Sequence, residues 1–257
     1  MKNAWIRVHV ARPLAIRRLV CFPHAGGGGN AYRPWANTLP EDVELCAIEL
    51  PGRETRFGEP LVNRMPTLLE ALEPIAEALC DRDTVFFGHS MGAVLAYELA
   101  LRLEARGGRV PRHLVVSARR APHLAVGDPA IHALSDDAFL DALVTRYEGI
   151  PAELLAHRDL IDLLLPIVRA DITLLETFTP TRDGRLGCPI SAFGGVADRH
   201  ATREQLEGWA AHTAGGFDCR TFEGGHFYLG QRRDQVMDAL SAILRRGGTP
   251  RAVAARA

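Results

Sequence analysis

The sequence predicts an α/β protein in which a mostly parallel sheet is covered by helices on both faces. Short runs rich in β-branched and aromatic residues alternate with longer helical patterns, an alternation typical of such a sheet. A Gly-x-Ser-x-Gly segment at residues 88–92 joins one apolar run directly to an Ala- and Leu-rich stretch. The chain has 257 residues, 47% of them hydrophobic, which is enough for one sizeable core.

The strands are identified as short apolar runs bounded by turn residues. In chain order they are expected at residues 18–22, 43–48, 84–87, 113–117, 189–193 and 218–222. Residues 5–10 alternate between apolar and polar side chains and are interpreted as an additional edge strand. The patterns between these runs predict helices at residues 31–39, 65–80, 91–106, 203–212 and 231–245. Residues 247–257 have little to pack against and are predicted to be a disordered tail.

One connection is far longer than the others. Residues 118–188 separate two predicted strands, whereas a crossover helix with its loops needs on the order of 20 residues. The excess contains helical patterns at 136–147, 152–157 and 159–177, with Pro151 and Pro166 as breaks or kinks. In a doubly wound sheet such an insertion lies over the carboxyl ends of the strands, where ligands bind. We therefore expect a helical lid at residues 119–185 and a core at residues 1–118 and 186–246.

The lid is rich in apolar side chains, which would line a greasy pocket or simply pack onto the body of the protein. These residues are Leu163, Leu164, Leu165, Ile167, Val168, Ile172, Leu174, Leu175 and Phe178. Both interpretations stay open at this point.

Composition excludes several classes of protein. The net charge of −1 gives no strong field for nucleic acid or an anionic membrane. No run of 18 apolar residues and no signal-peptide pattern is present, so a soluble, cytoplasmic protein is expected. The five cysteines show no C-x-x-C spacing, which favours neither a disulfide framework nor a zinc site.

The Gly-x-Ser-x-Gly segment makes Ser90 the candidate nucleophile. Between a strand and a helix, this pattern forms a sharp turn that strains the serine and lifts its hydroxyl above the sheet edge. Glycines are needed at Gly88 and Gly92 because a Cβ there would clash where strand and helix nearly touch. The alternative is an ordinary serine in a glycine-bounded turn.

A serine nucleophile needs a general base that is itself held by a third group, and in this architecture the chain order is Ser, then Asp or Glu, then His. Asp198 follows the strand at 189–193 on a loop, so it is the expected acid, with a local turn bond as the alternative role. His226 lies after paired glycines behind the last strand and is the expected base. His9, His200 and His212 are expected at the surface.

A glycine-rich loop, residues 22–30, follows the first core strand. A phosphate-binding interpretation fails because the G-K-[ST] ending is missing. In enzymes of the α/β-hydrolase fold the same place supplies one oxyanion-hole N–H, and the residue after the nucleophile supplies the other. Here these backbone donors are Ala25 and Met91.

Taken together, these motifs resemble the type II thioesterases, editing α/β-hydrolases that accompany polyketide synthases and nonribosomal peptide synthetases. The resemblance covers nearly the whole chain and rests on residues 22–27, 50–56, 88–92, 174–178, 189–198 and 225–229, in the family's order. It implies a triad of Ser90, His226 and Asp198, a helical lid, and no metal or organic cofactor. It also assigns Gly26, Gly27 and Phe227 to substrate binding.

The resemblance further implies the substrate, a short acyl group held as a thioester on the phosphopantetheine arm of an acyl or peptidyl carrier protein. The residues alone indicate only a serine hydrolase with a lid, expected to be a monomer. An esterase or lipase acting on free small esters is the main alternative. A non-catalytic scaffold that binds an acyl chain is disfavoured because Ser, Asp and His are all present.

Overall fold

The computed structural model describes residues 3–125, 127, 129–147 and 157–246. Its centre is a seven-stranded sheet with the order β1-β3-β2-β4-β5-β6-β7. The strands are β1 (Ile6–Arg7), β2 (Arg17–Phe22), β3 (Val43–Ile48), β4 (Asp83–His89), β5 (His113–Ser117), β6 (Ile190–Gly195) and β7 (Phe217–Phe222). Only β1 pairs antiparallel, with β3, and the other neighbours are parallel. The predicted α/β fold is therefore confirmed.

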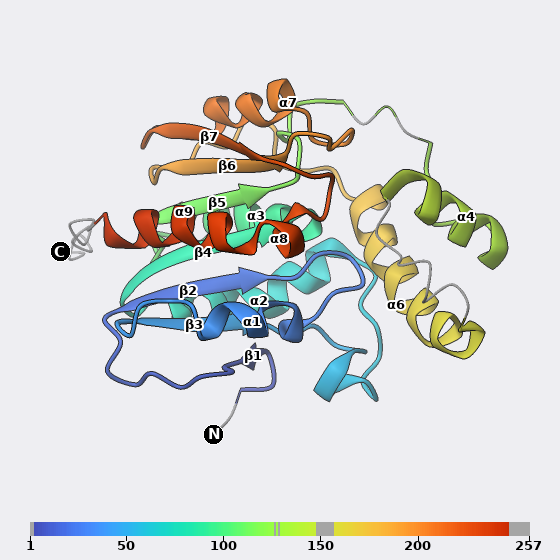
Figure 1. Ribbon diagram of the computed structural model, residues 1–257, viewed down its shortest axis with the longest axis horizontal. Helices are drawn as coiled ribbons and strands as arrows, with labels where there is room; N and C mark the ends of the chain where they lie inside the picture. Colours follow the sequence, from blue (N-terminus) through green and yellow to red (C-terminus); the bar gives the residue numbers. More distant parts are fainter. Residues whose placement is uncertain (1–2, 126, 128, 148–156, 247–257) are drawn as a thin grey trace.

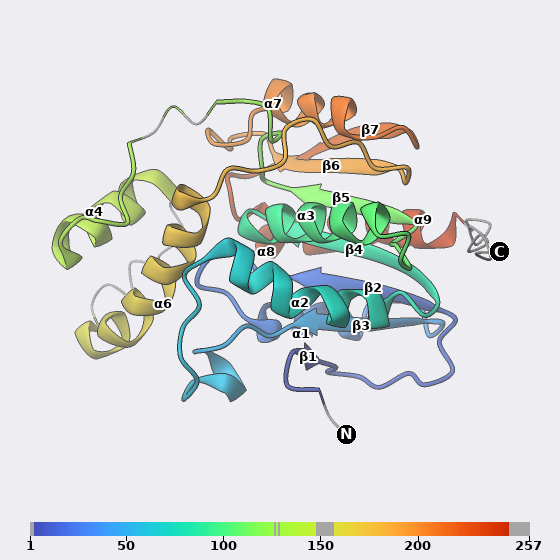
Figure 2. The same cartoon turned by 180° about the vertical axis from the view of Figure 1, so that it is seen from behind.

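Helices cover both faces of the sheet, as Figures 1 and 2 show. One face carries α2 (Met65–Leu79) and α3 (Met91–Ala105), and the other carries α1 (Arg33–Ala36) and α9 (Arg233–Arg245). The remaining core helices are α7 (Arg203–Glu207) and α8 (Tyr228–Gln231). The central strands β2, β4 and β5 are almost wholly buried, which explains their continuous apolar runs.

Several predicted elements are shorter than the sequence suggested. The helix expected at 31–39 is a 3-10 turn, Gly29–Tyr32, followed by α1. The helix expected at 203–212 changes to a 3-10 turn at Gly208, because glycine has a low helix propensity. The edge strand expected at 5–10 pairs over only two residues, and His9 then turns away to contact the carbonyl oxygen of Gly29 at 2.9 Å.

The described part of the long connection contains two helices, α4 (Asp136–Tyr147) and α6 (Arg158–Thr177). Both lie beyond the carboxyl ends of the strands (Figure 1). They pack on each other through a separate small cluster of side chains that includes Phe139, Leu165 and Ile172, and the Arg169 guanidinium stacks over the Phe139 ring at 4.1 Å. The helix predicted at 152–157 falls, apart from His157, outside the described residues, as does the tail at 247–257.

Within the described part of the chain, no helix combines the length and the apolar character needed to cross a membrane.

Candidate active site

Ser90 lies at the junction between β4 and α3, in a backbone conformation that L-residues rarely adopt, with φ 53° and ψ −110°. Its N–H donates to the Ser117 carbonyl oxygen on the neighbouring strand at 2.8 Å. A Cβ on Gly88 would collide with the carbonyl group of Gly92, and a Cβ on Gly92 with that of Phe22. The strained turn is therefore held by strand pairing and by two close backbone contacts.

Asp198 and His226 come from neighbouring loops at the carboxyl ends of β6 and β7. The two loops are joined by backbone hydrogen bonds, from Val196 N–H to Phe222 O at 2.8 Å and from Ala197 N–H to Gly224 O at 2.9 Å. Asp198 Oδ2 lies 2.8 Å from Nδ1 of His226, and both side chains are buried. The fold thus brings two residues that are 28 positions apart in the sequence into direct contact.

The carboxylate of Asp198 is ionised at neutral pH. Burial alone would raise its pKa, but the hydrogen bond with His226 and the charge of that imidazole together hold the pKa below its ordinary value. The second oxygen, Oδ1, accepts the backbone N–H of His200 at 2.9 Å. Both carboxylate oxygens therefore have a donor, which fixes the orientation of the group.

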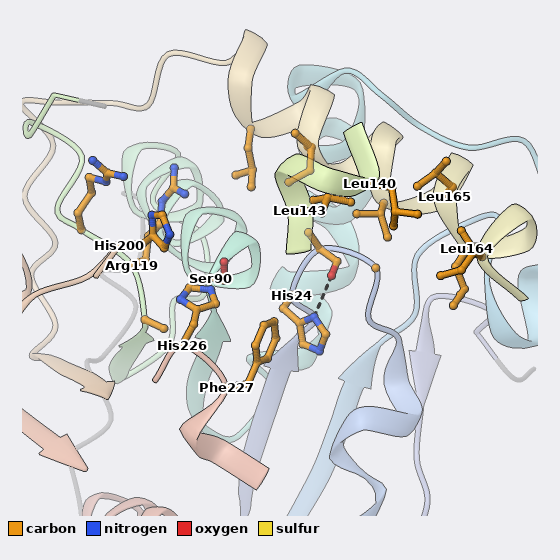
Figure 3. Close-up of a pocket in the computed structure, with 18 residues that line it drawn as sticks. His24, Ser90, Arg119, Leu140, Leu143, Leu164, Leu165, His200, His226 and Phe227 are labelled. Atoms are coloured by element: carbon orange, nitrogen blue, oxygen red, sulfur yellow. Dashed lines mark hydrogen bonds between the residues drawn. The ribbon is translucent and has the colours of Figure 1, made fainter. Parts of the chain in front are cut away.

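Ser90 and His226 line one cavity of about 230 Å³, and in the view of Figure 3 the Ser90 hydroxyl lies next to the imidazole of His226. The cavity has two chemically different ends. Leucines of α4 and α6 form one end, and Arg119 and His200 lie on the other side of Ser90 (Figure 3). The apolar members of the lining from the insertion are Leu140, Leu143, Ile161, Leu164, Leu165, Val168, Ile172 and Leu175.

Of the residues predicted to bind substrate or oxyanion, Ala25, Gly26 and Phe227 line this cavity. Gly27 does not: its N–H donates to the His24 carbonyl oxygen at 2.9 Å and its own carbonyl accepts from Arg53. Met91 is the first residue of α3, directly after Ser90, so its backbone N–H lies at the positive end of that helix.

Under the serine turn lies a buried series of hydrogen-bonded polar side chains, which the sequence did not predict. Nδ1 of His89 lies 2.8 Å from Ser117 Oγ, which lies 2.7 Å from the Tyr228 hydroxyl. Burial, with a further contribution from the charges of His226 and His24, lowers the pKa of His89 well below its ordinary value. A neutral imidazole therefore packs beneath the site, at a ring distance of 5.3 Å from His226.

Two histidines expected at the surface are less exposed than predicted: His200 is half-buried and His212 is buried. His200 lines the cavity together with Arg119 and Arg120, and none of these three loop residues carried a motif in the sequence. His212 is buried, and its Nδ1 lies 2.9 Å from the Tyr97 hydroxyl. The prediction for His212 was wrong, because its position at the end of a short 3-10 turn does not reveal which chain segments pack over it.

Among the described residues, no group of His, Cys, Asp or Glu is arranged to hold a metal ion.

The chain matches the model of the thioesterase domain over residues 17–244. A probable cadicidin biosynthesis thioesterase from Streptomyces griseus is 39% identical over 241 residues, which cover 93% of this chain and 66% of the relative. Thioesterase PikA5 from Streptomyces venezuelae is 37% identical over 238 residues, covering 92% and 84% of the two chains. The solved structure of BorB, the type II thioesterase from the borrelidin biosynthetic cluster, has a TM-score of 0.85 at 36% identity, covering 95% and 99%.

Proposed function

The chain belongs to the thioesterase family and is a thioester hydrolase, and from this premise we propose that it is an editing enzyme of polyketide or nonribosomal peptide biosynthesis. Its substrate would be a short or aberrant acyl group on the phosphopantetheine arm of an acyl or peptidyl carrier protein. The observation that carries this proposal is the cavity in which Ser90 and His226 meet an apolar end built from α4 and α6. The family names of the relatives support the same assignment.

In the proposed reaction, Ser90 is the nucleophile, His226 the general base and Asp198 the residue that orients His226. As Ser90 Oγ attacks the thioester carbonyl carbon, Nε2 of His226 takes the hydroxyl proton. The tetrahedral intermediate collapses, the carbon–sulfur bond breaks, and His226 returns the proton to the leaving sulfur. A water molecule, deprotonated by His226, then attacks the acyl-serine; the bond between the acyl carbon and Ser90 Oγ breaks, His226 gives its proton to Oγ, and the carboxylic acid leaves.

The proposed oxyanion hole consists of the backbone N–H groups of Ala25 and Met91. Negative charge develops on the carbonyl oxygen in the transition state, where a well-placed donor contributes about 3 kcal/mol. Gly26 and Phe227 would contact the substrate beside it. The proposed reaction requires neither a metal ion nor an organic cofactor.

The two ends of the cavity suggest how the substrate is oriented. We place the acyl chain at the apolar end of the cavity. There it would contact leucines of the insertion, such as Leu140 and Leu164, and we interpret this insertion as a lid. The arm then leaves past Arg119, Arg120 and His200, whose polar groups suit its amides and its phosphodiester. The enzyme is proposed to be cytoplasmic and to act as a monomer. A sedimentation measurement at micromolar concentration tests the oligomeric state.

Turnover of three acetyl substrates tests the proposal: acetyl-carrier protein, acetyl-CoA and p-nitrophenyl acetate. The proposed function predicts the highest kcat/KM for the carrier-bound thioester. Equal or faster turnover of the free ester would indicate an esterase instead. Binding of acyl carrier protein without turnover of any of the three would indicate a scaffold.

A further inference from the structure

A buried ion pair that the proposed mechanism does not use lies directly behind the glycine-rich loop. Arg53, on the loop after β3, donates from Nη1 to Asp171 Oδ2 at 2.6 Å and from Nη2 to Oδ1 at 2.8 Å. Asp171 is wholly buried and Arg53 is 5% exposed. Burying a charge pair is costly, and removing one partner leaves an uncompensated buried charge, so the further contacts of these two side chains indicate what the pair does.

The pair holds the glycine-rich loop by its backbone. Asp171 Oδ2 accepts the N–H of Gly26 at 2.8 Å, and Arg53 Nη1 also donates to the Gly27 carbonyl oxygen at 3.0 Å. The His24 carbonyl accepts the N–H of Gly27 at 2.9 Å. A trans peptide points its N–H opposite to its carbonyl group, so this last bond directs the N–H of Ala25 away from Gly27.

The same contact reaches the insertion. Asp171 belongs to α6, and so does Val168, whose side chain packs so closely on Gly26 that a Cβ there would collide with it. Gly26 has φ +74°, a left-handed conformation that glycine adopts without strain. Helix α6 therefore contacts Gly26 of the glycine-rich loop through both a charged and an apolar side chain, and the close apolar contact requires a glycine there.

We propose that Arg53 and Asp171 are positioning residues that hold the loop of residues 24–27 so that the Ala25 N–H faces the reacting carbonyl oxygen, and that they thereby couple α6 to the oxyanion hole. This inference rests on the proposed serine mechanism. Neither side chain touches the substrate. Because the oxyanion forms only after attack on the carbonyl and is absent from the bound substrate, misplacing the donor lowers kcat and leaves the KM of a short acyl substrate unchanged.

Two single variants test the proposal, with p-nitrophenyl acetate as the substrate because it needs an oxyanion hole but no carrier protein. Asp171→Asn keeps the shape, but its NH₂ group must face a donor: Arg53 Nη2 if the amide oxygen takes the place of Oδ2, or the Gly26 N–H and Arg53 Nη1 if it takes the place of Oδ1. Arg53→Lys keeps the charge but loses the planar fork that reaches Asp171 and Gly27 together. Each is expected to lower kcat by about 10- to 100-fold, with KM within about twofold of wild type.

The matched control is Arg18→Lys. Arg18 is buried to the same degree and bridges Glu44, Asp81 and the Leu79 carbonyl oxygen, but it lies at the start of β2, the opposite end of the strand from the site. This variant is expected to melt at a lower temperature than wild type and to keep the wild-type kcat when assayed well below its melting temperature. The pH profile of kcat/KM should be unchanged in all three variants, because His226 and Asp198 are untouched.

A double variant, Arg53→Lys with Asp171→Glu, keeps opposite charges in the buried site and serves if a single variant fails to fold. It is expected to show the same loss of kcat. Values of kcat within twofold of the Arg18→Lys control would overturn the proposal, as would a loss confined to KM. Ser90→Ala is assayed in parallel: an active Ser90→Ala refutes the serine mechanism itself, which separates the two failures.

Discussion

Replacing Asp198 by Asn tests the proposed triad most directly, because the structure gives both carboxylate oxygens a donor. Oδ2 faces Nδ1 of His226 at 2.8 Å and Oδ1 accepts the His200 N–H at 2.9 Å. An asparagine has one acceptor oxygen and one donor NH₂. If the oxygen keeps the His200 N–H, the NH₂ faces Nδ1, so that nitrogen must accept and the proton moves to Nε2.

With the proton on Nε2, His226 cannot accept the hydroxyl proton of Ser90. Holding the catalytic imidazole in the wrong tautomer costs roughly 10⁴-fold in kcat in serine hydrolases, or about 5 kcal/mol of transition-state stabilisation. The opposite amide orientation places two donors, the NH₂ and the His200 N–H, against each other, so this orientation is unfavourable and does not restore the correct tautomer. The Asp198→Asn protein should fold, because the substitution conserves shape.

The assay is kcat on an acetyl thioester from pH 5 to 9, with circular dichroism as the check on folding. Asp218→Asn is the control. Asp218 accepts a hydrogen bond from Ser191 Oγ near the start of β7, at the opposite end of the strands from Asp198. It should keep wild-type kcat. A folded Asp198→Asn protein that retains more than about one hundredth of wild-type kcat would refute the tautomer argument.

Four further results are expected. Ser90→Ala and His226→Ala should each remove nearly all turnover, and the double variant should be little worse, because the triad acts as a unit; additive losses would contradict this. A fluorophosphonate probe should label wild type but not Ser90→Ala, as read by intact mass. Burial, with a smaller contribution from Arg112, lowers the pKa of His113 to about 4, so charging this side chain should destabilise the protein by about 3 kcal/mol as pH drops from 6.5 to 4, and His113→Gln should reduce the acid-induced loss of stability by that amount in denaturant titrations. Leu164→Trp should lower kcat/KM for longer acyl chains by about fourfold per methylene excluded while sparing acetyl, and an unchanged chain-length profile would remove Leu164 from the acyl site.

The local parts of the site were predictable from the sequence because they are encoded locally. The turn at Ser90 is written in five consecutive residues, and Asp198 and His226 each follow a strand in the expected chain order. The fold followed from periodicity, although short helices such as α1 were overestimated, since apolar spacing does not mark where a 3-10 turn replaces a helix.

The parts that were missed depend on contacts between distant segments. Arg53 and Asp171 are 118 positions apart, and neither lies in a pattern that indicates the other. His200 was expected at the surface, but the packing of its loop beside Arg119 brings it to the cavity. No local rule contains this information, because a side chain's partner across the fold is decided by topology and not by its sequence neighbours.

Helix α6 makes two kinds of contact with different consequences for the reaction. Side chains on both sides of Pro166, such as Leu164 before it and Ile172 after it, line the cavity, so movement of this helix changes the space available to an acyl chain. Asp171, also in α6, is fixed to Arg53 and to the loop that carries Ala25. The proline removes one backbone hydrogen bond within α6 and is therefore the natural place for this helix to bend. Bending there would shift Leu164 and Leu165, and so change the space for an acyl chain, while Asp171 keeps its contact with the loop of residues 24–27.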